Sequence, residues 1–150
     1  MSTKRRPGVF LLLPVLLLTL AFLAGGCPRQ QVYDYSSLVS DLRDLGATVE
    51  ERMHQAESGL FPGALRRNII IGGGNIQVYE YETPEAMEEF AGYISGSGSQ
   101  IKRDNVVTMI DWIDYPHFYM SGQIIVIYVG RDPEIIDLLE RLLGKQFAGA

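Results

Sequence analysis

The chain contains a single cysteine, Cys27, at the point where a long apolar run gives way to polar sequence. Basic residues at positions 4–6 precede the run, which extends over 9–24 without a charged residue and ends in Gly25 and Gly26. A basic start, an apolar stretch and small residues at its end are the parts of a secretory signal peptide. We therefore expect the folded part of the protein to lie after Cys27.

The segment LAGGC, residues 23–27, resembles a bacterial lipobox, in which signal peptidase II cleaves before the cysteine and a diacylglycerol is joined to its sulfur. Under this interpretation residues 1–26 are a lipoprotein signal peptide and Cys27 becomes the lipidated first residue. The alternative is an uncleaved transmembrane helix, because the run over 9–26 has the ~18 residues needed to cross a bilayer. In both cases the basic cluster stays inside the cell and the rest of the chain is extracytoplasmic.

Composition limits what the remaining chain can be. Removal of residues 1–26 leaves 124 residues with 10 basic and 18 acidic side chains, a net charge of −8. This length suits one domain with a real core. With Cys27 joined to lipid no disulfide is available, so packing alone must stabilise the domain. The chain lacks the basic stripe of a nucleic-acid-binding protein, and we expect no nucleic-acid partner.

We expect a lipidated tether over residues 27–35 and a single domain over 36–150. Three stretches have helical spacing and helix-ending signals. The first covers 36–46, with leucines three and four residues apart and Gly46 at its end. The other two begin with Thr83-Pro84 and Asp132-Pro133, a capping side chain followed by proline at the first helical position.

Strand patterns alternate with these helices. We expect a strand entering at 47–50, a hairpin over 66–82 around a Gly-Gly-Gly-Asn turn, and strands at 105–113 and 123–129. The segment DYPHFYMSG, residues 114–122, is predicted as the loop that joins the last two. These elements predict an α+β fold in which about three helices pack an antiparallel sheet of four to five strands as a two-layer sandwich.

Few residues in the sequence suggest catalysis, phosphate binding or metal binding. The stretch IIIGGGN lies between two strands and lacks the lysine of a phosphate-binding loop, so we interpret it as a hairpin turn. The two histidines, His54 and His117, have no second ligand at metal-binding spacing. No serine lies in a GxSxG segment. We therefore predict no metal, no cofactor and no enzymatic activity.

Aromatic side chains gather around His117, and Trp112, Tyr115 and Tyr119 lie within a few residues of it. In a loop, such residues offer contact area and polar tips that suit recognition of a ligand. Alternatively, they flank a hairpin and fill the core. The sequence leaves both interpretations open.

Four segments, LRDLGATVEE, IQVYEYET, PHFYMSGQIIVIYVG and LLERLLGKQFAG, resemble those of small bacterial lipoproteins of uncharacterised function, over residues 38–149. The resemblance implies a cell-envelope lipoprotein with one compact domain, and no activity or ligand. From the lipobox and the lack of a catalytic constellation we expect a noncatalytic interaction or accessory domain, held on the membrane by its lipid, with an envelope protein or a small ligand as partner. The alternative function is a lipoprotein that binds a small ligand through the aromatic loop around His117.

Overall fold

The computed structural model describes residues 32–57 and 59–149, apart from the side chains of residues 53–57. The predicted signal peptide and Cys27 lie outside these residues, as does the side chain of His54. The helices are α1 (Tyr35–Asp44), α2 (Pro84–Ala91) and α3 (Pro133–Leu143). The strands are β1 (Glu50–Glu57), β2 (Leu65–Ile71), β3 (Gly74–Glu80), β4 (Gln100–Arg103), β5 (Val106–Met109), β6 (Pro116–Ser121), β7 (Ile124–Val129) and β8 (Ala148–Gly149).

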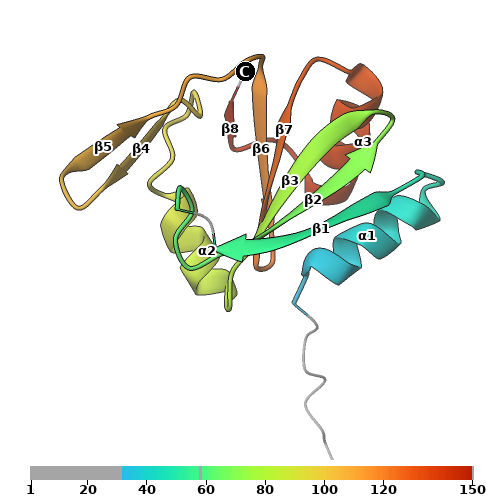
Figure 1. Ribbon diagram of the computed structural model, residues 1–150, viewed down its shortest axis with the longest axis horizontal. Helices are drawn as coiled ribbons and strands as arrows, with labels where there is room; N and C mark the ends of the chain where they lie inside the picture. The colour runs from blue at the N-terminus through green and yellow to red at the C-terminus, as the bar shows by residue number, and fades with distance from the viewer. Residues whose placement is uncertain (1–31, 58, 150) are drawn as a thin grey trace, which may run out of the picture. The chain divides into compact units, whose positions relative to one another are not determined.

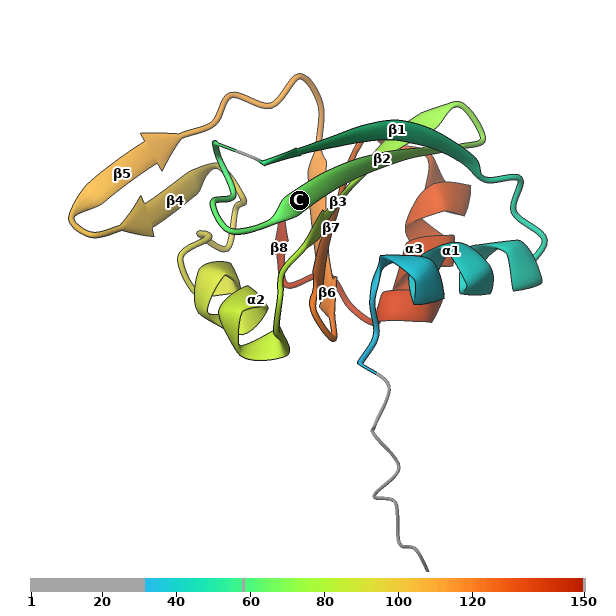
Figure 2. The ribbon, with the colours of Figure 1, turned by 60° about the horizontal axis from the view of Figure 1, so that its bottom comes forward.

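Six of these strands form one antiparallel sheet in the order β1-β2-β3-β7-β6-β8 (Figure 1). The pairing of β3 with β7 joins two hairpins that are far apart in the sequence. The remaining strands, β4 and β5, form a separate two-stranded hairpin, which projects away from the sheet in both views (Figures 1 and 2).

Helices cover both faces of the large sheet (Figure 2). Helices α1 and α3 pack on one face, where alternate residues of β3 and β7, such as Ile76 and Val126, are buried against Leu38 and Leu139. Helix α2 packs on the other face. The buried side chains there are contributed by the intervening strand positions and by the β1–β2 loop, Tyr79, Ile125, Ile127, Phe118 and Phe61 among them. Helices thus cover both faces of the sheet at β7, and this explains why the strand is apolar on both sides.

The helix signals are confirmed. The Thr83 side chain accepts a hydrogen bond from the Ala86 N–H at 3.2 Å, and Asp132 accepts one from the Glu134 N–H at 2.9 Å. Helix α1 begins slightly earlier than expected, because Asp34 caps it in place of Ser36 or Ser37. Residues 33–35, which we expected in the tether, thus belong to the folded domain.

The hairpin of β2 and β3 is also confirmed, with a two-residue turn. Ile71 pairs with Gly74, and Gly72 and Gly73 between them have φ values of 57° and 85°. A turn with positive φ at both central residues matches the twist of the flanking strands, and glycine adopts it without strain.

The α+β class is confirmed, but the sheet differs from expectation in two ways. It has six strands because the expected loop at 114–122 contains β6 and because β8 adds a short edge strand. Its helices lie on two faces and not on one. The expected strand at 105–113 is shorter, since β5 ends at Met109, and it pairs with β4 outside the large sheet.

Within residues 32–57 and 59–149, no helix has both the length and the apolar character required to span a membrane.

Candidate functional site

The four aromatic-loop residues do not form one site. Strand alternation places Tyr119 in the cluster under α1 and α3, while its neighbour Phe118 faces the α2 side. Trp112 packs edge-on against Phe118 and donates its indole N–H to the Gly98 carbonyl at 2.9 Å. Tyr115 lies under the Arg131 guanidinium, 4.3 Å from its ring centre. The expected loop over 114–122 is wrong, because Pro116–Ser121 form β6, which places His117 and Tyr119 in the sheet and leaves Trp112 and Tyr115 before it.

His117 is buried on β6 and both of its ring nitrogens have protein partners. Nδ1 lies 2.8 Å from the Gln146 side-chain oxygen and Nε2 lies 3.1 Å from the Gly130 carbonyl. Its ring stacks on Tyr128 with an interplanar angle of 19°. These contacts join β6 to the chain on either side of α3. Among the described residues, no group of three or more His, Cys, Asp or Glu side chains could hold a metal ion.

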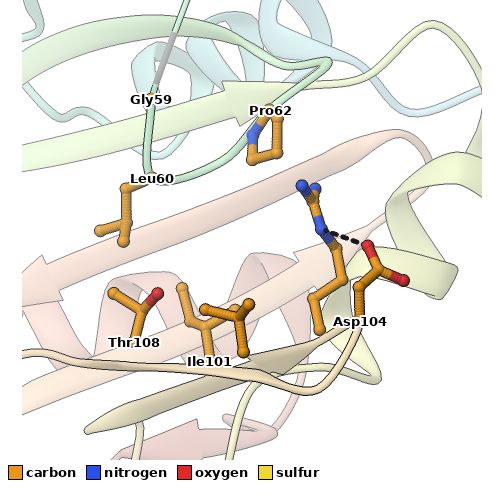
Figure 3. Close-up of a pocket in the computed structure, with 8 residues that line it drawn as sticks. Gly59, Leu60, Pro62, Ile101, Asp104 and Thr108 are labelled. Atoms are coloured by element: carbon orange, nitrogen blue, oxygen red, sulfur yellow. Dashed lines mark ion pairs between the residues drawn. The ribbon is translucent and has the colours of Figure 1, made fainter.

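A different part of the domain contains a cleft. We use the name hairpin cleft for two neighbouring surface cavities between the β1–β2 loop, α2 and the β4–β5 hairpin. The smaller cavity has a volume of about 230 Å³ and the larger one about 480 Å³. Pro62, Arg103 and Asp104 line both, so they form the neck between the two. Figure 3 shows the smaller cavity, with Leu60 and Pro62 on the loop above and Ile101 and Thr108 on the hairpin below.

The upper wall of the cleft is held by Phe61. This side chain is fully buried, stacks on Tyr79 with ring centres 4.0 Å apart and lies 5.1 Å from the Phe90 ring. The Ala64 N–H closes the turn by donating to the Phe61 carbonyl at 3.2 Å. Because Phe61 points into the core, its neighbours Leu60 and Pro62 are left at the cavity.

The lower wall is held at the base of the hairpin. The Lys102 N–H donates to the Tyr93 carbonyl at 2.8 Å, Ile94 and Ile101 form a β-bridge, and the Ile101 side chain is buried. Beyond this base the hairpin is exposed, with Val106 and Met109 more than 60% accessible to solvent. The cleft is thus built from a fixed base and a projecting arm.

The larger cavity combines aromatic and acidic side chains. Phe90 and Tyr93 meet edge to face at 5.9 Å, and the Tyr93 hydroxyl donates to Glu89 at 2.7 Å. Glu82, Glu89 and Asp104 contribute three carboxylates to its lining and Arg103 the one guanidinium, which pairs with Asp104 at 3.3 Å. The charge of this lining favours a cation or a neutral ligand over an anion.

Tyr81 is the polar group in the cleft that needs a partner. It lines the larger cavity, it is only 4% exposed, and its buried hydroxyl has no hydrogen-bond partner among the described residues. Burial raises the pKa of Tyr81 far above its ordinary value, and nearby Arg103 partly offsets the rise. The hydroxyl is therefore a protonated donor at neutral pH. Buried donors are nearly always satisfied in proteins, so this hydroxyl is an exception within the described part of the domain.

The polar groups that line the cleft are carboxylates, hydroxyls and one guanidinium. Its hydroxyl groups belong to Thr108 and to tyrosines, and no histidine, cysteine or serine lines either cavity. A nucleophile activated by an adjacent base therefore has no counterpart in this lining.

Sequence reasoning missed the cleft, because Pro62, Tyr81 and Arg103 come from three separate segments. One signal was present. Tyr79 and Tyr81 alternate with Glu80 at and just beyond the end of β3, and both tyrosines are buried on the α2 side.

In comparisons with protein-family models, curated proteins and solved structures, nothing matches this chain.

Proposed function

We propose that this protein is an extracytoplasmic lipoprotein of the bacterial cell envelope, whose folded domain is a noncatalytic binding or accessory module. The single observation that carries the proposal is the position of Cys27, directly after LAGG at the end of a charge-free apolar run. A lipidated cysteine carries two or more acyl chains, which is enough for stable membrane attachment.

The start of the folded domain supports attachment close to a membrane. The Tyr33 carbonyl accepts a hydrogen bond from the Gln123 N–H at 2.9 Å, so the chain is already part of the fold at this residue. Only residues 28–32 separate it from Cys27. Fully extended, such a segment reaches about 20 Å. A lipid on Cys27 would therefore keep the domain near the bilayer surface.

The chemistry of the hairpin cleft supports a binding role. Its cavities offer apolar, aromatic and acidic surface, which are features of recognition sites. The alternative of a small-ligand site around His117 is not carried further, because those side chains are divided between the two faces of the sheet and the end of β6.

The anchor is tested by the intact mass of the protein purified from its native membrane, compared with a Cys27→Ser variant. We expect a chain that starts at Cys27 and carries diacylglycerol, and we expect this modification to be lost in the variant. An inhibitor of signal peptidase II should cause the precursor to accumulate. A mass that still includes Met1 would show instead that the apolar run is retained as a transmembrane anchor.

The proposal that the domain is noncatalytic is tested separately. A turnover activity that is abolished by one polar substitution in the hairpin cleft, such as Thr108→Val, would contradict it.

A further inference from the structure

We propose that the protein forms a reversible dimer in which the free edge of β5 pairs antiparallel with the same edge of a second copy. This inference goes beyond the proposed function and does not depend on the lipid, because β5 belongs to the folded domain. We use the name β5 edge for the side of Val106–Met109 that faces away from β4.

The backbone of β4 shows which residues of the hairpin point their hydrogen-bonding groups outward. The Lys102 N–H donates to the Tyr93 carbonyl at 2.8 Å. The Gln100 carbonyl accepts from the Ser95 N–H, also at 2.8 Å. Gln100 and Lys102 therefore direct these groups away from β5, toward the segment that precedes the hairpin.

The same alternation determines what the β5 edge presents. Gln100 pairs with Met109, and Lys102 pairs with Val107. In an antiparallel ladder, two residues directly opposite each other either exchange both hydrogen bonds or point both sets of groups outward. Val107 and Met109 thus direct their N–H and C=O groups to the β5 edge. In the described part of the chain, no second strand pairs with β5 there.

The other sheet edges within residues 32–57 and 59–149 are blocked. Strand β1 has four charged residues in the sequence EERMHQAE, and its register shifts between Arg52 and Ala56. Charged residues and bulges are features that prevent edge pairing. Strand β8 has two residues, and its Gly149 N–H already donates to the Gly96 carbonyl. The β5 edge differs, because Val106–Met109 contain no charge and pair with β4 without a shift.

The β5 edge is also accessible. Val106, Val107 and Met109 are each more than half exposed to solvent. The hairpin projects away from the large sheet in both views (Figures 1 and 2). An exposed apolar edge with unpaired backbone groups is a template for another strand.

The β5 edge is complementary to itself, which is why we assign a second copy as the occupant. When Val107 lies opposite Met109 of the second copy, two-fold symmetry creates the reverse pair, and both pairs exchange two hydrogen bonds. This register uses all the outward groups of both residues. The apolar side chains meet on one face, and Thr108 lies opposite Thr108 of the second copy on the other. Such cross-strand pairs are favourable, and no like charges oppose each other.

Charge also favours contact through the hairpin. The chain after residue 26 has a net charge of −8, so most surfaces of two copies repel. The hairpin over 100–109 carries Lys102, Arg103 and Asp104, two basic residues and one acidic residue. Two acidic domains therefore meet with least repulsion at this hairpin.

The size of the contact sets its strength. A standard stable interface buries about 1,200–2,000 Å² and involves about 20–30 residues from each partner. Two four-residue edges supply much less. We therefore expect a weak dimer with a Kd on the order of 100 μM.

The test is disulfide cross-linking of the full-length protein in detergent, in a Cys27→Ser background that has no other thiol. In the proposed register the two Thr108 Cα atoms lie about 4.5 Å apart, which a disulfide can span. The two Val106 Cα atoms are offset by about 14 Å along the strands, which a disulfide cannot span. With diamide as oxidant, we expect Thr108→Cys to form a covalent dimer about tenfold faster than Val106→Cys. Equal rates, or no covalent dimer of Thr108→Cys, would overturn the proposal and leave the β5 edge to a strand of another protein.

A backbone variant tests the hydrogen bonds of the β5 edge. Val107→Pro removes an outward N–H and spares the bonds to β4, since proline is tolerated on an edge strand where the N–H faces solvent. Added to Thr108→Cys, it should slow cross-linking about tenfold, whereas the matched control Val107→Ala keeps the N–H and should slow it less than about threefold. Equal rates for the two would show that the copies do not pair through this edge. Because the background carries no lipid, these results are independent of the anchor.

Discussion

The carboxylate of Glu80 joins three separate segments of the chain. One oxygen accepts hydrogen bonds from the Tyr35 N–H at 3.2 Å and the Gln123 side chain at 3.3 Å, and the other pairs with the Arg67 guanidinium. Arg67 also lies over the Tyr35 ring, 4.4 Å from its centre. Because the Glu80 side chain is only 15% exposed, its removal would leave a partly buried guanidinium without its carboxylate.

We expect Glu80→Ala to lower the free energy of unfolding by about 2 kcal/mol, measured by urea denaturation. Glu82→Ala is the matched control, since this exposed carboxylate two residues away should change stability by less than about 0.5 kcal/mol. Equal losses in the two variants would contradict a stabilising role for the Glu80 contacts.

A buried and a partly buried tyrosine predict a loss of stability at alkaline pH. Burial raises the pKa of Tyr119 to about 12, with a smaller contribution from nearby Glu140, and burial together with a hydrogen bond to Glu51 raises the pKa of Tyr35 to about 12. The unfolded chain releases these protons near pH 10 and the folded one does not, so stability is complete below about pH 10 and falls as pH rises toward 12. Unfolding measured across this window should show the fall, and Tyr119→Phe should reduce its slope.

At the scale of elements, two hairpin turns provide a matched test of whether Tyr33, at the start of the folded domain, is held against the β6–β7 turn. Gly72 and Gly122 both begin two-residue turns with positive φ, 57° and 55°. A Cβ on Gly72 would meet nothing within 4 Å, whereas a Cβ on Gly122 would collide with the backbone of Tyr33, whose nitrogen would lie 2.7 Å away.

Gly72→Ala should therefore cost about 1 kcal/mol from the left-handed backbone alone, and Gly122→Ala about 3 kcal/mol because Tyr33 must also move. Thermal or urea unfolding of the two variants measures the difference. Similar costs would show that Tyr33 is not held against the β6–β7 turn.

The elements that the sequence predicted are those whose signals are local. The caps at Thr83 and Asp132 and the Gly72-Gly73 turn depend on neighbouring residues only. Strand β6 was missed because Asp114, Pro116 and His117 are typical of a loop, although proline is tolerated as the first residue of a strand. This segment is a strand because it pairs with β7 and β8. Strand β8 has only two residues, which is too short for a recognisable sequence pattern.

At the scale of the whole molecule, the position of the site depends on contacts between distant segments. Pairing of β3 with β7 places the β2–β3 and β6–β7 hairpins in one sheet. Helices α1 and α3 then cover one face of this sheet and α2 covers the other. The hairpin cleft then forms where the β1–β2 loop, α2 and the β4–β5 hairpin meet on one face. Each wall has an ordinary local sequence, so apart from the alternation of Tyr79 and Tyr81 the sequence gives little indication of the cleft.

The same topology separates Tyr33, at the start of the folded domain, from Ile113, the most exposed apolar side chain among the described residues. Tyr33 is bonded at the β6–β7 turn, whereas Ile113, which is 99% exposed, precedes the opposite end of β6. Six residues of strand span about 20 Å. If Cys27 carries lipid, the β6–β7 turn should therefore lie nearer the bilayer than Ile113, and the apolar end should face away from the membrane, toward other envelope proteins.

This orientation can be measured with a fluorophore on a cysteine introduced as Ser121→Cys or Ile113→Cys, since a lipidated Cys27 leaves no other thiol. In vesicles that contain lipids with a quencher in the headgroup, we expect stronger quenching of the label at position 121 than at 113. The Cys27→Ser background, which should stay in solution, provides the unquenched reference for each label. Stronger quenching at 113 would reverse the assignment, because it would place the exposed apolar end against the bilayer and make that end a second membrane contact.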